Sequence, residues 1–239
     1  MLDQDAIKRV LVVTAHPDDV DFGAGGTIAT LTKAGVEVFY CICTNGDAGG
    51  FDRDTPRSEI AGIRQAEQRA AGAVLGVHDV TYLGYPDGKL EISQELRRDI
   101  SRQIRRVKPD VVLTQSPERH WLRIGASHPD HMAAGEAALR AVYPDARNPF
   151  AHPELLEDEG LDAYSVPEVW VSGREHPNHW VDVTDTFALK QEALLCHVSQ
   201  LAKPAELETM LRGWLTMQAE AGGLPEGRLA EAFYRMETA

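Results

Sequence analysis

The stretch Val10-Leu11-Val12-Val13-Thr14-Ala15-His16-Pro17-Asp18-Asp19-Val20-Asp21 places a histidine and three carboxylates directly after an apolar run. Residues 10–13 are uncharged and mostly β-branched, which predicts a strand buried within a sheet. Pro17 and the glycines that follow Phe22 end the strand in a turn. Ligands bind at the carboxyl ends of strands in open α/β sheets. The polar groups at this strand end therefore indicate a site suited to a metal ion.

Strand-like and helix-like segments alternate from this stretch onward. Strands are expected at 10–15, 36–43, 80–83, 110–114, 169–171 and 180–183. Helices are expected at 24–34, 57–75 and 93–107, and a further helix near Asp185. Ser93 is a suitable N-cap for the third helix. The alternation predicts an α/β fold with a mostly parallel, doubly wound sheet and helices on both faces.

The 239 residues are enough for one α/β domain with a full core. We expect a single domain over 1–239, with a loop-rich insertion at about 143–167 and a helical extension from about 204. The insertion carries several acidic residues. It could be a solvated face, a substrate lid or a subunit contact, and the sequence leaves these three alternatives open.

Composition restricts the class of partner. The net charge of −13 argues against nucleic acid and anionic membranes as partners. The first residues lack the basic and apolar stretches of a signal peptide, and no apolar run approaches the ~20 residues that span a bilayer. We therefore expect a cytoplasmic protein. The three cysteines cannot form an even disulfide framework, and Cys41 and Cys43 are expected to be plain core residues.

A second polar cluster, Ser127-His128-Pro129-Asp130-His131, follows the strand expected at 110–114. His128 and His131 are three residues apart, as are His16 and Asp19, so one turn brings each pair to the same side. Pro129 suits the first turn of a helix. Two histidines and one carboxylate with an open position for water form a common catalytic zinc site. An aspartate and a histidine would remain as base and acid.

Several of these features also have other interpretations. A single His–Asp pair in a turn is usually a hydrogen-bonded cap, but two such clusters after strands favour a site. His176 and His179 have the same spacing, yet their polar surroundings favour a surface loop. The glycines in 23–26 invite a dinucleotide-binding interpretation. That pattern fails because Ile28 stands where its third glycine is required.

These motifs resemble the PIG-L/LmbE-like zinc-dependent N-deacetylases, a family with enzymes acting on N-acetylglucosaminyl lipids and on bacillithiol and mycothiol precursors. The resemblance covers roughly residues 8–200 and implies a Rossmann-like sheet. It rests on Ala15-His16-Pro17-Asp18-Asp19, Gly23-Ala24-Gly25-Gly26-Thr27, Thr44-Asn45-Gly46-Asp47, Arg64-x-x-Glu67-x-x-x-Ala71, Leu83-Gly84-Tyr85-Pro86-Asp87-Gly88 and Ser127-His128-Pro129-Asp130-His131. The chain departs from many members at Val20, where they carry Glu, which bears on groups that support the metal ligands.

The resemblance also assigns roles. It implies the metal ligands His16, Asp19 and His131. Asp18 would be the general base, and His128, oriented by Asp130, would stabilise the oxyanion or protonate the leaving amine. The implied metal is zinc, with another divalent ion such as Fe²⁺ as the alternative. Contacts to the sugar are assigned to Arg64, Asn45 and Asp87.

The predicted function is a zinc-dependent hydrolase that removes an acetyl group from an N-acetylated amino sugar or its conjugate, of the N-acetylglucosamine type. An alternative is an amidase that acts on a thiol–sugar conjugate or tailors a natural product. A third hypothesis, from a different class, is a metal- or sugar-binding module without catalysis. The expected partner is a small molecule. The family resemblance also favours a homo-oligomer.

Overall fold

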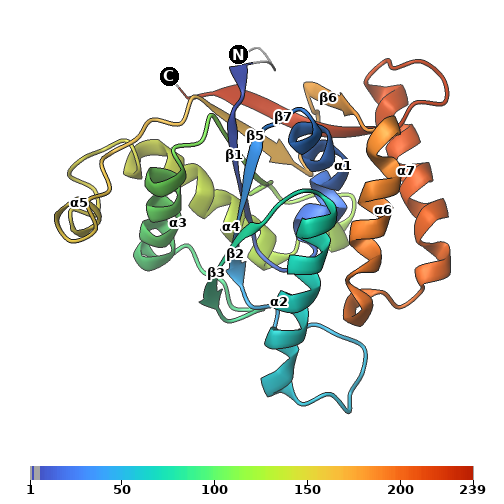
Figure 1. Cartoon of the computed structure of the whole chain (residues 1–239), viewed down its shortest axis with the longest axis horizontal. Coiled ribbons are helices and arrows are strands. Elements are labelled where there is room, and N and C mark those ends of the chain that lie inside the picture. The colour runs from blue at the N-terminus through green and yellow to red at the C-terminus, as the bar shows by residue number, and fades with distance from the viewer. Residues whose placement is uncertain (1, 3–5, 239) are drawn as a thin grey trace.

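Seven strands form one sheet in the order β3-β2-β1-β4-β5-β7-β6 (Figure 1). The computed structural model describes Leu2 and residues 6–238. Its strands are β1 (Arg9–Thr14), β2 (Glu37–Thr44), β3 (Asp79–Tyr85), β4 (Val111–Gln115), β5 (Glu168–Ser172), β6 (His179–Asp182) and β7 (Ala230–Glu237). Neighbours among the first five strands pair in parallel, whereas β7 pairs antiparallel with both β5 and β6. The predicted α/β fold with a mostly parallel sheet is confirmed.

Helices cover both faces of this sheet, as expected for a doubly wound fold (Figure 1). They are α1 (Asp19–Lys33), α2 (Arg57–Val74), α3 (Gln94–Val107), α4 (Pro129–Arg140), α5 (Glu154–Glu157), α6 (Phe187–Leu195) and α7 (Leu207–Ala221). Short 3₁₀ or π turns lie at Ile124–Ala126, Ala141–Asp145, Thr184–Thr186, Val198–Gln200 and Pro204–Glu206. Ser93 caps α3 as predicted, because its side chain accepts a hydrogen bond from the Leu96 amide.

The sheet divides the core into two layers, one on each face of β1. Val10 and Val12 face a cluster built with α1, α2, α6 and α7, whereas Leu11 and Val13 face a cluster built with α3 and α4. This alternation follows from the two-residue period of a strand. Because both faces of β1 are buried, its sequence is a continuous apolar run rather than an alternating one.

The C-terminal segment differs from the predicted helical extension. The helix α7 is present and buries Leu207, Leu211 and Leu215, but residues 230–237 form the strand β7 inside the sheet. Ala, Glu, Arg and Met in this segment favour a helix by intrinsic propensity. The strand forms because β5 and β6 supply hydrogen-bond partners on both of its edges, which local propensity does not register.

The predicted insertion at 143–167 contains little regular structure apart from the single-turn α5. Arg105 of α3 is 1% exposed and donates to the carbonyl oxygens of Asp145, Ala146, Asn148 and Ala151. The insertion is thereby tied to α3 at its beginning. Among the described residues, no helix is long and apolar enough to cross a membrane.

The glycines in α1 allow close packing of this helix. A Cβ atom on Gly26 would lie 2.7 Å from the Cβ atom of Val183, and one on Gly25 would lie 3.2 Å from the Lys190 side chain. Helix α1 therefore approaches α6 and the end of β6 more closely than a larger residue would permit. This packing leaves the start of α1 at the carboxyl edge of the sheet.

Candidate active site

The predicted site residues come together at the carboxyl edge of the parallel strands. His16 follows β1, Asp19 begins α1, and Asp87 follows β3. His128 is the N-cap of α4 and His131 lies in its first turn, with Pro129 at the start as expected. Segments more than a hundred residues apart therefore meet here because parallel strands end at the same edge.

His16, Asp19 and His131 place four potential ligand atoms close together: one nitrogen from each histidine and both carboxylate oxygens of Asp19. The His16 Nδ1 atom lies 3.3 Å from His131 Nε2 and 3.4 Å from an Asp19 carboxylate oxygen, and His131 Nε2 lies 3.0 Å from the other Asp19 oxygen. Ligand atoms about 2.0–2.1 Å from a tetrahedral zinc ion are separated by about 3.3 Å. The donor set and its spacing therefore fit a zinc ion.

His128 stands beside this group. Its ring centroid is 4.8 Å from that of His16 and 5.0 Å from that of His131, so the three imidazoles form a second group of potential ligands. Its Nδ1 atom accepts a hydrogen bond from the Asp130 amide, which leaves Nε2 for another partner. Burial, together with the nearby His16 and His131, lowers the pKa of His128. A neutral imidazole is thereby favoured at this position.

The Asp130 carboxylate supports His16 rather than His128. It is 1% exposed, accepts hydrogen bonds from the Gly88 and Leu90 amides, and lies 3.2 Å from His16 Nε2. Its link to His128 runs through the backbone amide alone. The structure thus differs from the expectation that Asp130 orients His128: its side chain instead contacts the ring of a candidate ligand, His16.

Asp87 also contacts the outer nitrogen of His16, at 3.1 Å. Burial would lower the pKa of His16, but its hydrogen bonds with the carboxylates of Asp19 and Asp87 outweigh burial and raise the pKa to about 10. Burial likewise opposes ionisation of Asp19, but hydrogen bonds with His131 and His16 lower its pKa. Asp19 and Asp87, whose pKa values are both lowered, are therefore held in their charged forms.

Asp18 has a different environment from Asp19. It is the N-cap of α1, has a φ of 94°, and its carboxylate lies 3.4 Å from the Arg64 guanidinium. Burial and the adjacent Asp19 carboxylate raise the pKa of Asp18 to about 7. A carboxyl group with such a pKa can take up and release a proton near neutral pH.

Residues 11–142 match the family model described as PIG-L, GlcNAc-PI de-N-acetylase, which is more than half of the chain. The chain belongs to the PIG-L family. The matched region contains both strand-end clusters, so the resemblance noted in the sequence is confirmed.

Individual relatives of this PIG-L protein are deacetylases. The diacetylchitobiose deacetylase of Thermococcus kodakarensis is 34% identical over 194 residues, covering 81% of this chain and 70% of the relative. A probable N-acetyl-alpha-D-glucosaminyl L-malate deacetylase 2 of Bacillus anthracis is 30% identical over 221 residues, covering 89% and 91%. Amide hydrolysis is thus the activity named for both.

Solved structures agree on the fold. The N,N'-diacetylchitobiose deacetylase of Pyrococcus horikoshii superposes with a TM-score of 0.88 at 34% identity, covering 97% of this chain and 84% of the other. GalB of Pseudomonas putida, a 4-carboxy-2-hydroxymuconate hydratase, has a TM-score of 0.79 at 21% identity, with 98% of each chain covered. This second likeness concerns the fold alone, since one fold can carry different reactions.

The three residues assigned to sugar contacts flank the group. The Arg64 side chain is 4% exposed and donates to the carbonyl oxygens of Pro17 and Gly46. Asn45 accepts a hydrogen bond from the Gln65 side chain. Asp87, besides its contact with His16, accepts from the Ala48 amide. Contact of these side chains with a substrate stays a prediction.

His176 and His179 lie outside the group. His179 begins β6, and its ring packs 4.8 Å from the ring of Trp170. His176 has a φ of 60° in the connection before that strand. Neither belongs to a cluster of metal-binding type among the residues that the structure describes.

The sequence predicted no role for two buried residues behind the site, Gln68 and His197, which both contact Asp21. Gln68 contacts both the Asp18 amide and the Asp21 carboxylate, and His197 contacts the same carboxylate. One signal was available for Gln68: it follows Arg64 by four residues, which places both on one face of α2. The sequence offers no comparable signal for His197.

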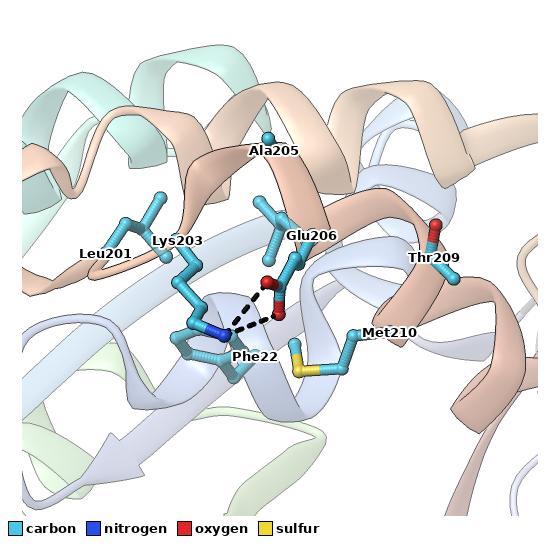
Figure 2. Close-up of a pocket in the computed structure, with 8 residues that line it drawn as sticks. Phe22, Leu201, Lys203, Ala205, Glu206, Thr209 and Met210 are labelled. Atoms are coloured by element: carbon cyan, nitrogen blue, oxygen red, sulfur yellow. Dashed lines mark hydrogen bonds and ion pairs between the residues drawn. The ribbon is translucent and has the colours of Figure 1, made fainter.

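An apolar groove of about 700 Å³ lies beside α1 and α7 (Figure 2). Its lining includes Phe22 of α1, Met210 of α7 and Leu201 from the connection before α7. Figure 2 also shows Lys203 paired with Glu206, at 2.9 Å. None of the predicted site residues lines this groove in the described part of the chain.

Proposed function

We propose that this PIG-L protein is a zinc-dependent hydrolase that removes the acetyl group from an N-acetylglucosamine-type sugar or its conjugate. The observation that carries the proposal is the group of His16, Asp19 and His131, whose donor atoms lie 3.0–3.4 Å apart with Asp18 adjacent. The names of the two deacetylase relatives support the choice of reaction and of an N-acetyl sugar as substrate.

His16, Asp19 and His131 would hold the metal. A bound zinc ion supplies a water of lowered pKa and polarises the amide carbonyl. Zinc is favoured because two imidazoles and one carboxylate are typical of its catalytic sites, and Fe²⁺ is the alternative ion. Asp130, bonded to the far side of the His16 ring, keeps that ring oriented.

Asp18 would act as the general base. Its pKa of about 7 matches the working range of a group that accepts a proton during attack on an amide. Arg64, 3.4 Å from the carboxylate, restrains where it can turn. A correctly placed base contributes about 10²–10⁴-fold to the rate.

His128 would serve the leaving group. Its Nδ1 atom is occupied by the Asp130 amide, so Nε2 is the atom that can exchange a proton with substrate. Its lowered pKa favours the neutral imidazole with its proton on Nε2, which can donate a hydrogen bond to negative charge on the amide oxygen. To protonate the departing amine, His128 would first take up the proton that Asp18 removes from water.

Three further assignments belong to this proposal. They are a single domain over 1–239, a cytoplasmic location, and a homo-oligomeric state. Each stays a prediction that the fold is compatible with. The direct measurements are limited proteolysis for the domain, fractionation for the location, and light scattering for the oligomeric state.

The test is acetate release by the purified protein together with metal analysis. The panel contains N-acetylglucosamine, diacetylchitobiose, N-acetylglucosaminyl malate and inositol, an N-acetylated thiol–sugar conjugate and an acylated natural product. We expect release from at least one N-acetylglucosamine compound. Release from the thiol–sugar conjugate or natural product alone would replace the sugar assignment. No release from any compound, with metal bound, would favour a binding module.

Two variants test the residue roles. We expect Asp18→Ala to lose turnover by about 10²–10⁴-fold while metal remains bound. We expect His131→Ala to lose the metal itself. Near-normal turnover in the first variant would contradict the base assignment, and full metal occupancy in the second would contradict the ligand assignment.

A further inference from the structure

We propose that Gln68 is a positioning residue, which holds the peptide bond before Asp18 and so aims the Asp18 carboxylate into the site. Gln68 is fully buried on α2, and its side chain reaches the backbone at the end of β1 across 50 residues of sequence. The inference rests on the proposed function, because it takes Asp18 to be the base.

The backbone at Asp18 needs such support. Its φ of 94° and ψ of −27° lie in the left-handed region, which residues other than glycine adopt at a cost in free energy. The Asp18 side chain makes no capping hydrogen bond that would stabilise this conformation. Contacts from elsewhere in the fold must therefore keep the turn in place.

Two side chains of α2 form hydrogen bonds with the carbonyl oxygen and the amide nitrogen of the peptide bond between Pro17 and Asp18. Arg64 Nη2 donates to the Pro17 carbonyl oxygen at 2.6 Å, and Gln68 Oε1 accepts from the Asp18 amide at 2.7 Å. These two residues are four apart, so they project from the same face of the helix. Because both its C=O and its N–H group are held, this peptide unit cannot rotate. The φ of Asp18 is fixed as a consequence.

Of these two residues, Gln68 is the better choice for a test of positioning. Arg64 also lies beside the Asp18 carboxylate, so its removal would change the charge around the base as well as its position. Gln68 contacts Asp18 through the backbone amide, and its side chain is uncharged. An effect of Gln68 on turnover would therefore come from geometry.

A second contact fixes which way the Gln68 amide faces. Its Nε2 atom donates to Asp21 Oδ2 at 2.7 Å, and His197 Nε2 lies 2.8 Å from the same oxygen. A carboxylate only accepts hydrogen bonds, so the amide nitrogen must face Asp21 and its oxygen must face Asp18. Gln68, Asp21 and His197 are all 0% exposed, so water does not compete for these atoms.

The test compares Gln68→Met with Gln103→Met. Both replace a buried glutamine on a helix by an apolar side chain of similar length. Gln103 lies on α3, on the opposite face of the sheet, and accepts a hydrogen bond from Arg106. The control therefore reports the general consequence of losing a buried amide.

We expect Gln68→Met to lower kcat by about 10- to 100-fold, because a displacement of about 1 Å at a reacting group costs that much. KM and metal content should stay within about twofold of wild type. The substrate-free protein gives an independent readout: the Asp18 amide should exchange with deuterium faster in Gln68→Met and unchanged in Gln103→Met. An unchanged kcat or unchanged exchange at Asp18 would overturn the proposal.

The double variant Asp18→Ala/Gln68→Met separates positioning from structural support. If Gln68 acts through Asp18, the double variant should keep the residual activity of Asp18→Ala. A further loss equal to that seen in the wild-type background would show a purely structural role. Should Gln68→Met fail to fold, Gln68→Asn retains an amide in the buried site and allows the same comparisons.

The two failures are distinguishable. Full activity in Asp18→Ala would refute the base assignment of the proposed function, whatever Gln68 does. Deuterium exchange at the Asp18 amide tests its hydrogen bond to Gln68 independently of activity. Faster exchange at Asp18 with a normal kcat in Gln68→Met would confirm the hydrogen bond between Gln68 and the Asp18 amide but refute its role in positioning.

Discussion

Adjacent carboxylates in this chain differ because of their long-range partners. Hydrogen bonds with His131 and His16 lower the pKa of Asp19, whereas burial and the Asp19 charge raise that of Asp18 to about 7. Opposite pKa shifts suit neighbouring acids to different roles: the proposed ligand stays ionised, and the proposed base can exchange a proton near neutral pH. The proximity of the His16 and Asp19 side chains could be predicted from sequence, because the two residues are three apart. The contact of Gln68 with Asp18 could not, since it joins residues 50 apart.

Asp130 offers a test at the scale of one residue. Asp130→Asn replaces the carboxylate that accepts from two amides and contacts His16 Nε2. We expect metal affinity to fall about 10- to 100-fold, because groups that orient a ligand typically contribute that much. Competition with a chelator measures it. Glu136→Gln, at a half-buried residue of the same helix that pairs with Arg140, is the control. Equal affinity in both variants would refute the supporting role.

Gly26 tests the close packing of α1. Gly26→Ala places a Cβ atom 2.7 Å from the Val183 side chain, so we expect the free energy of unfolding to fall by about 1–3 kcal/mol. Gly62→Ala is the matched control, since no atom lies within 4 Å of its Cβ position in α2. That change should stabilise by up to about 1 kcal/mol. Urea denaturation measures the free energy of unfolding of both variants. A change of the same sign in both would contradict the close packing at Gly26.

At the scale of elements, prediction succeeded where local pattern and fold agree. The apolar runs of β1, β2 and β4 and the capped α3 were found because burial, propensity and end signals coincide there. The strand β7 was missed because its sequence favours a helix, while its partners β5 and β6 lie far away in the chain. Tertiary pairing overrides weak local preference in such a segment.

A buried ion pair joins three of these elements. Lys190 of α6 and Glu231 of β7 lie 2.7 Å apart, and both are at most 2% exposed. Lys190 also donates to the carbonyl oxygens of Asp21 and Phe22, and Glu231 accepts from the Gly26 and Thr27 amides. The pair therefore connects the last strand to the helix that begins in the site.

Removing one member of this pair should be costly. We expect Lys190→Met to lower the free energy of unfolding by about 3–5 kcal/mol, because Glu231 is left buried without its counter-charge. Lys190→Met/Glu231→Gln should recover part of the loss. Chemical denaturation of the single and double variants measures the coupling. A double variant as unstable as the sum of the singles would exclude coupling between them.

At the scale of the whole molecule, an ion pair joins two neighbouring strands that lie far apart in the chain. Arg235 of β7 holds Glu168 at the start of β5 through two hydrogen bonds of 2.6 and 2.9 Å. Burial would raise the pKa of Glu168, but the bonds from Arg235, the Leu2 amide and Trp170 outweigh burial and lower it. The ionised form of Glu168 therefore stabilises the fold.

The sign of the pH dependence follows from that shift. Because the folded pKa of Glu168 lies below its unfolded value of about 4.3, the contribution is complete above that value and is lost as pH falls through the folded pKa. We expect Glu168→Gln to be about 3–5 kcal/mol less stable than wild type at pH 7. The difference should shrink below pH ~4, since protonated Glu168 resembles glutamine. Denaturation from pH 7 to 3 tests this, with the exposed Glu208→Gln as control. A difference that does not vary with pH would refute it.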